Sequence, residues 1–178
     1  MRRKGLGPRP ELWFCVRYAG FLLILFFICE TPPGQSVLRS FRLATATAVS
    51  LGLHTVGLSN TIVGDALRFE GVTGGLQIID ECTAVFPIMA LLAFFLAFPA
   101  PFWKRAVGGG VGVTSLLVLN LLRLLGAGLL LRYRPRLFAP IHDYVWQLGF
   151  MAVTVGVGMI WAGWVTNRRG STIRNGTG

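Results

Sequence analysis

The sequence has little charge for its length. Only 13% of its 178 residues are Asp, Glu, Lys or Arg, whereas 53% are hydrophobic. A soluble domain carries about 25% charged residues, because it covers its surface with them. A chain this poor in charge cannot cover itself in water. The composition therefore excludes an ordinary soluble domain and predicts a membrane protein.

Long apolar runs stand where the charge is missing. A helix needs about 20 apolar residues to cross a bilayer. Five segments approach or exceed this length: Leu12–Cys29, Leu43–Leu58, Thr83–Trp103, Ala106–Leu131 and Tyr144–Val165. They lack the strict apolar–polar alternation of a transmembrane β-barrel. The prediction is an all-α, polytopic transmembrane bundle of about five helices, which forms a single membrane domain over residues 1–170, followed by a polar tail at 168–178.

Two connections are distinctive. Glu30–Ser36 contains Pro32 and Pro33, which predict a turn after the first helix. The more polar stretch Ser59–Glu81 holds three short runs of strand-forming residues separated by glycines, and this spacing predicts a small β-hairpin on the membrane surface. The runs are Thr61–Val63, Ala66–Phe69 and Leu76–Ile79.

The positions of the cations suggest a topology but do not settle it. Cytoplasmic loops carry an excess of Lys and Arg, so Lys104 and Arg105 are placed inside and the Ser59–Glu81 loop outside. Two features oppose this assignment: Arg132, Arg134 and Arg136 would face outward, and five crossings would put the basic N-terminus outside as well. The side of the N-terminus therefore stays open at this point.

Several function classes lack their usual signals. The net charge of +10 comes from cations at the ends of apolar segments, where they contact anionic lipid headgroups, and not from an aromatic-interleaved basic stripe. Nucleic acid is therefore not an expected partner. The three cysteines make no disulfide framework. The motifs Gly-x-Ser-x-Gly and His-Glu-x-x-His are absent, and neither a metal nor another cofactor is predicted.

Polar side chains in or beside membrane helices are costly, so each suggests a function. Cys82 begins the third segment, Asn120 and Arg123 share one face of the fourth, and His142 and Asp143 precede the fifth. In an alternating bundle, the third and fifth helices begin at the same membrane face. Arg123 is predicted to lie roughly 12 Å below that face, at 1.5 Å rise per residue. Cys82, Arg123 and His142 can therefore converge near one interface.

Such a trio suits acyl transfer. A Cys82 thiolate would attack a carbonyl, and His142 would take the thiol proton and later protonate the leaving amine. Arg123 could stabilise the thiolate or the oxyanion of the tetrahedral intermediate. Structural roles remain open: Cys82 as a packing residue, Arg123 paired with Asp143, and Asn120 as a hydrogen bond between helices.

Three motifs together resemble the exosortase/archaeosortase family, and the small size of the chain is similar to the compact exosortase H group. The motifs are Glu81–Ala84 at a helix start, Asn120–Arg123 in the next helix, and His142–Gln147 at the start of the last helix. One feature departs from the family pattern. The family commonly has Ser or Asn and then Gly after the cysteine, where this chain has Thr83 and Ala84.

The resemblance implies a membrane-embedded cysteine peptidase or transpeptidase with Cys82 as nucleophile and Arg123 and His142 as its partners. Asn120 and Asp143 would support them. Its substrates would be membrane-tethered proteins that end in a short motif, a transmembrane helix and a basic tail. They would be cleaved near the motif and passed to a cell-surface acceptor. The enzyme would be a multi-pass protein of the cell (inner) membrane, with its active site on the extracytoplasmic side.

Two other functions remain open. A small transporter or channel would use Arg123 and Asn120 as a substrate site near the bilayer midplane, although no inverted repeat is visible. A non-catalytic assembly factor for envelope or polysaccharide machinery would tolerate Cys82→Ala, whereas the enzyme would not.

Overall fold

The computed structural model describes residues 10–71, 75–141 and 145–174, and it confirms the predicted all-α fold. The helices are α1 (Pro10–Glu30), α2 (Pro32–Thr55), α3 (Val85–Ala97), α4 (Phe102–Tyr133), α5 (Pro135–Pro140) and α6 (Trp146–Arg174). A small sheet of β1 (Asn60–Val63), β2 (Ala66–Phe69) and β3 (Gly75–Gln77) and the 3-10 helix η1 (Asp80–Cys82) lie between α2 and α3.

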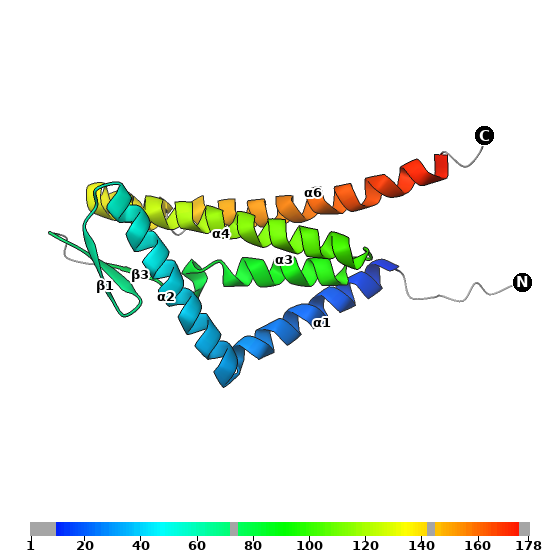
Figure 1. The fold of residues 1–178 in the computed structure, drawn as a ribbon, viewed down its shortest axis with the longest axis horizontal. Helices are drawn as coiled ribbons and strands as arrows, with labels where there is room; N and C mark the ends of the chain where they lie inside the picture. The colour runs from blue at the N-terminus through cyan, green and yellow to red at the C-terminus, as the bar shows by residue number, and fades with distance from the viewer. Residues whose placement is uncertain (1–9, 72–74, 142–144, 175–178) are drawn as a thin grey trace, which may run out of the picture.

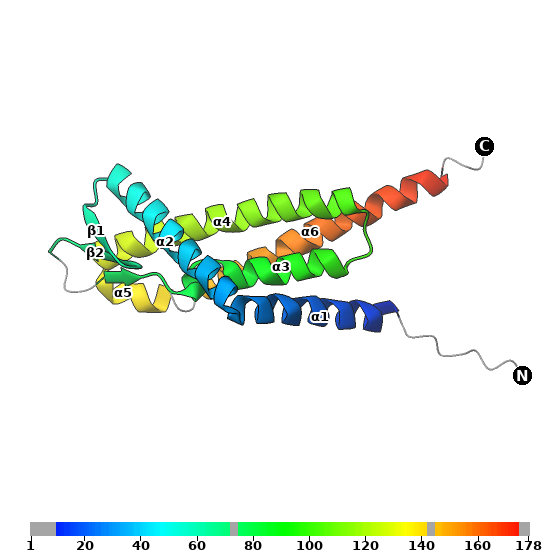
Figure 2. The ribbon, with the colours of Figure 1, turned by 60° about the horizontal axis from the view of Figure 1, so that its bottom comes forward.

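The helices form an elongated bundle with two different ends (Figure 1). The sheet and α5 lie at one end, here called the sheet end (Figure 2). The beginning of α1, the connection between α3 and α4, and the last turns of α6 lie at the other, here called the connection end. Helix α4 runs from one end to the other, whereas α1 and α3 lie in the part of the bundle toward the connection end; α1, α3, α4 and α6 alternate in direction.

Within the described ranges, three helices are long and apolar enough to cross a membrane. They contain the spans Glu11–Glu30, Phe102–Tyr133 and Trp146–Asn167. The apolar helix α3 has 13 residues and is therefore about 20 Å long at 1.5 Å per residue. Large apolar side chains of α1, such as Leu23 and Phe27, are exposed. This outward apolar surface is what a lipid environment requires.

Helix α2 differs from the prediction. It begins at Pro32, not Leu43, and only Thr31 separates it from α1, so a turn spanning Glu30–Ser36 was wrong. The two prolines occupy the first positions of the helix, where a missing N–H costs nothing, and the Thr31 hydroxyl accepts a hydrogen bond from the Gly34 N–H at 3.2 Å. Helix α2 does not qualify as a span, and it slants across the bundle toward the sheet (Figure 1).

The course of α1 and α2 bears on the membrane topology of the chain, which the positions of the charged residues in the sequence did not settle. Helix α1 begins at the connection end, which also carries Lys104 and Arg105 in the first turn of α4. Arg132, Arg134 and Arg136 lie around the junction of α4 and α5 at the opposite, sheet end. The positive-inside rule is therefore met by the first set of cations and opposed by the second.

The predicted hairpin is present and is extended by a third strand. Strands β1 and β2 pair antiparallel around Gly64, whose φ of +67° suits a residue without a Cβ. Strand β3 pairs with β2, with Leu76 opposite Leu67. The buried face of the sheet packs against Leu53 of α2 and Leu124 of α4 in one apolar cluster that also contains Cys82. The sheet therefore covers the Cys82 turn.

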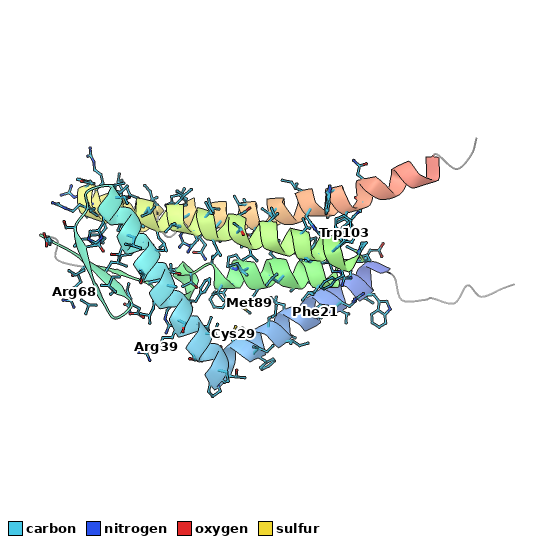
Figure 3. The ribbon with its side chains drawn as sticks, viewed as in Figure 1. Phe21, Cys29, Arg39, Arg68, Met89 and Trp103 are labelled. Carbon is cyan, nitrogen blue, oxygen red and sulfur yellow. The ribbon has the colours of Figure 1, made fainter. Side chains whose placement is uncertain are left out.

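Helix α1 packs along α3. Cys29, in the last turn of α1, places its Sγ 3.7 Å from the Sδ of Met89 in α3, and Figure 3 shows the two side chains between these helices. The rings of Phe14 and Phe94 meet edge to face with centroids 5.8 Å apart. Cys29 is therefore a packing residue, whereas Cys15 is exposed on α1.

Candidate functional site

Cys82 lies at the end of a tight turn. Its N–H donates to the Ile79 carbonyl at 2.9 Å. The following residue, Thr83, donates from both its N–H (3.0 Å) and its hydroxyl (2.7 Å) to the Asp80 carbonyl. Cys82 is only 4% exposed and Thr83 is fully buried. The chain therefore presents the thiol from a rigid, buried loop just before α3, which begins at Val85 instead of the expected Thr83.

The turn is strained at Ala84. Its φ is +64°, and no other residue except glycine has a positive φ in the described part of the chain. A left-handed conformation costs an L-residue roughly 1–2 kcal/mol, because its Cβ approaches the following carbonyl. Ala84 adopts the conformation that glycine adopts at low cost. Strain of this kind persists where the surrounding structure fixes it.

Helix α4 brings two predicted residues to the Cys82 turn. Asn120 is 3% exposed, and its Nδ2 donates a 2.7 Å hydrogen bond to the Cys82 carbonyl. Arg123, one turn further along α4, is 8% exposed and lies close enough to Cys82 for its charge to act on the thiol. The structure thus brings Cys82, Asn120 and Arg123 together, whereas the predicted convergence of Cys82 and Arg123 with His142 stays a prediction.

Arg123 is a buried cation without a counter-ion among the residues that the structure describes. No carboxylate of these residues pairs with it, and none of them satisfies its Nε with a hydrogen bond. Its nearest aromatic contact is Phe150 of α6, with the guanidinium carbon 6.0 Å from the ring centroid. A buried charge is costly unless it is paired. Asp143, the partner weighed from the sequence, lies outside the described residues.

The environment keeps Cys82 in its thiol form. Burial raises the pKa of Cys82 above the ordinary cysteine value. A backbone hydrogen bond at Ile79 and the charge of Arg123 lower this pKa in part, and the neighbouring Glu81 raises it again. Since the net direction is upward, the resting thiol is protonated at neutral pH. A base must then remove its proton before it can attack a carbonyl.

Arg42 of α2 connects the site to its surroundings. Its Nη1 lies 2.6 Å from Oδ1 of Asp80, and its Nε lies 3.6 Å from Oδ2 of Asp65 in the β1–β2 turn. The Asp65 carbonyl in turn accepts the N–H of Ile78 at 2.9 Å. Arg42 therefore holds α2, the sheet and the Cys82 turn together. Arg42 was not predicted as a site residue, because the acidic character of the loop beyond α2 was the only signal for it in the sequence.

His142 and Asp143, the other two predicted site residues, lie outside the described residues, and so their positions relative to Cys82 stay a prediction. The residues that follow them are described. Trp146 packs beside Gly126 of α4, and Phe150 lies over Arg123. The beginning of α6 therefore contacts the stretch of α4 that carries Arg123.

No group of three or more His, Cys, Asp or Glu residues that could hold a metal ion is found within the described ranges. No family model matches the chain, and no curated protein or solved structure matches it. The chemistry of Cys82, Asn120 and Arg123 is consequently the basis for a functional assignment.

Proposed function

We propose that this protein is a membrane-embedded cysteine peptidase or transpeptidase that acts on membrane-tethered proteins. The observation that carries the proposal is a buried thiol beside a buried arginine that no carboxylate of the described residues neutralises. Cys82 and Arg123 are both more than nine-tenths buried. Such a cation beside a nucleophile is the arrangement that stabilises a developing oxyanion.

The proposed reaction follows from the state of each group. A base, for which His142 is the candidate, removes the Cys82 proton, and the sulfur attacks the scissile carbonyl to form a C–S bond. The oxyanion of the tetrahedral intermediate is stabilised by Arg123. The C–N bond then breaks, and the departing amine takes the proton from the base. An acceptor hydroxyl, amine or water resolves the thioester and releases the thiol.

Arg123 is assigned to the oxyanion and not to a resting thiolate. Burial raises the pKa of Cys82 in spite of the nearby guanidinium, so the resting enzyme holds a neutral thiol. The charge of Arg123 then gains its anionic partner at this site only when negative charge develops on the substrate. Interactions that form only in the transition state are those that raise the rate.

The topology favours an extracytoplasmic position for this site. The connection end carries Lys104 and Arg105 and follows the basic N-terminal residues, so it is assigned to the cytoplasm. Cys82 lies toward the sheet end, where a protein held by a C-terminal transmembrane helix would present the segment just outside that helix. We therefore propose substrates with a short motif, a transmembrane helix and a basic tail, and an acceptor at the cell surface.

The proposal is tested by co-expression with a candidate substrate of this design and an immunoblot of its C-terminal processing. Wild type is expected to shorten the substrate, whereas Cys82→Ala and His142→Ala at equal membrane levels leave it intact. Cys29→Ala is the matched control, because Cys29 packs against Met89 away from the site. Normal processing by Cys82→Ala would refute the enzyme and favour a non-catalytic assembly factor.

A further inference from the structure

A groove lies between α2 and α4, beside the carbonyl of Cys82. One face of α2, from Phe41 to Ala48, forms one wall, and Leu117 and Leu121 of α4 form the other. The groove has a volume of about 280 Å³. Its lining residues are apolar except for Thr45 and Asn120.

The groove is open because α2 and α4 touch near the sheet and separate beyond it. A side chain at Gly52 would come within 2.7 Å of Leu125, and one at Gly128 would come within 3.0 Å of Leu53. From this contact α2 slants away from α4 toward the end of α1 (Figure 1). Small residues on the rim, such as Ala44 and Ala48, keep the opening wide, and both are exposed.

The floor of the groove carries an unused hydrogen-bond acceptor. Asn120 lines the groove and is 3% exposed. Its Nδ2 is occupied by the Cys82 carbonyl, but its Oδ1 has no hydrogen-bond partner within the described part of the chain. Leaving a buried acceptor unsatisfied costs about 1–3 kcal/mol. A ligand that enters the groove and brings an N–H donor would remove this cost.

We propose that the groove receives the first turn of an apolar helix of the substrate, and that a backbone N–H of this turn donates to Asn120 Oδ1. The first four N–H groups of any helix lack intrahelical partners, and inside a membrane they must be satisfied by protein. The acyl chain of a phospholipid fits the apolar walls but has no donor for Asn120. The proposal rests on the proposed function, because it places the peptide bond that precedes this helix beside Cys82.

The test uses the full-length protein in phosphatidylcholine vesicles with Cys15, Cys29 and Cys82 replaced by Ser. The probe is a synthetic peptide of about 20 Leu and Ala residues, with one cysteine in its first turn and a lysine tail. Ala48→Cys reports on the groove. Val155→Cys is the matched control, since Val155 is 56% exposed on α6 and does not line the groove.

Under mild oxidation, the disulfide yield with Ala48→Cys is expected to exceed that with Val155→Cys at least fivefold. Asn120→Leu should lower the Ala48→Cys yield about fivefold, as expected for the loss of one buried hydrogen bond. Because Asn120→Leu also removes the bond to Cys82, Ala44→Trp serves as a second variant. It fills the groove from its rim and should lower the yield to a similar extent. Equal yields at the two cysteines, or yields that neither variant changes, would overturn the proposal.

This test is independent of catalysis, because the nucleophile is absent throughout. Cross-linking in the groove without any substrate processing by wild type would keep the groove as a helix site and reject the proposed reaction. Processing by wild type without preferential cross-linking would keep the reaction and reject the groove.

Discussion

Two buried cations of the same helix show how differently the two ends of this protein use charge. Lys104, at the connection end of α4, is 7% exposed, and Arg123, closer to the sheet end, is 8% exposed. The Lys104 Nζ donates to the Val165 carbonyl at 3.3 Å, and it lies 5.6 Å and 5.2 Å from the ring centroids of Trp103 and Trp164. Among the described residues, Arg123 has one distant aromatic ring and no partner for its Nε.

The surroundings of Lys104 supply partners for both its backbone carbonyl and its ammonium group. The Trp161 Nε1 donates to the Lys104 carbonyl at 2.9 Å, and the indole fits because Gly108 has no side chain to meet it. Aromatic rings also attract the ammonium charge. Around Arg123, by contrast, the turn is strained at Ala84 and the nearby thiol is neutral. The comparison teaches that two similarly buried cations of one helix differ in their surroundings: Lys104 has a carbonyl and two indole rings, whereas Arg123 has a single distant ring among the described residues.

The largest effect should come from exchanging the buried arginine. We expect Arg123→Gln to lower the rate of substrate processing about 100-fold or more, as the loss of an oxyanion-stabilising group does. Its thermal stability in detergent should stay equal or increase, because an uncompensated buried charge is removed. Processing is measured by immunoblot and stability by thermal unfolding. A stable Arg123→Gln protein with wild-type processing would contradict the functional role of this charge.

Disrupting the support of the Cys82 turn should have an intermediate effect. Arg42→Gln removes both contacts, to Asp80 and to Asp65. Because these side chains are partly exposed, the loss of stability should be about 1 kcal/mol or less. Processing should fall about tenfold, since a small displacement of a nucleophile is costly. Arg42→Lys should recover part of the rate. If Arg42→Gln lost stability in proportion to activity, the residue would be merely structural.

Replacing Lys104, whose ammonium group has partners, should have the opposite effects on stability and processing to replacing Arg123. Lys104→Met keeps the length of the side chain but loses the Val165 hydrogen bond and the attraction to the two indoles. We expect a loss of stability of about 1–2 kcal/mol, seen as a lower unfolding temperature. Processing per folded molecule should be unchanged. A specific loss of processing in a stable Lys104→Met protein would break the comparison between the two ends.

The smallest effect concerns the strain at Ala84. Glycine accepts the observed φ of +64° without the steric cost of about 1–2 kcal/mol, but it loses about 0.5–1 kcal/mol through greater freedom of the unfolded chain. Ala84→Gly should therefore raise stability by about 0.5 kcal/mol and leave processing intact, as thermal unfolding and immunoblots would show. Ala84→Val is the contrasting variant and should be markedly destabilised. If the Ala84→Val protein were as stable as wild type, the turn would not be strained.

Much of the fold could be predicted because it depends on local patterns. The apolar runs of α1, α4 and α6 reach the length of a bilayer crossing, and glycines separate the three strands. The course of α2 could not be predicted in the same way. Pro32 and Pro33 are equally compatible with a turn and with the first positions of a helix, and only the Thr31 cap and the packing against the sheet decide between them.

The residues of the candidate site likewise divide into those that local sequence patterns predict and those that only the tertiary structure brings together. Cys82 and Arg123 could be predicted to lie near one interface, together with His142, because the helix rise and the alternating directions fix their depth. Asn120 could be placed on the same helix face as Arg123 from the helix period. Arg42 could not, since its partners Asp65 and Asp80 are brought to it by the fold of the sheet and not by spacing along the chain. The tertiary structure likewise determines which of the described residues surround Arg123. Asp143, the partner weighed from the sequence, lies outside those residues.

The most direct test of the central claim is the pH dependence of alkylation of Cys82 by iodoacetamide, with wild type compared with Arg123→Gln. Both carry Cys15→Ser and Cys29→Ser, so that only Cys82 reacts. Burial places the midpoint of the wild type above that of a free thiol, whose pKa is about 8.5. Removing the positive charge destabilises the thiolate, so the pKa of Cys82 should rise further in Arg123→Gln and alkylation at a given pH should slow. Identical profiles for the two proteins would contradict the central claim that the charge of Arg123 lies beside the Cys82 sulfur, on which its assignment to the oxyanion rests.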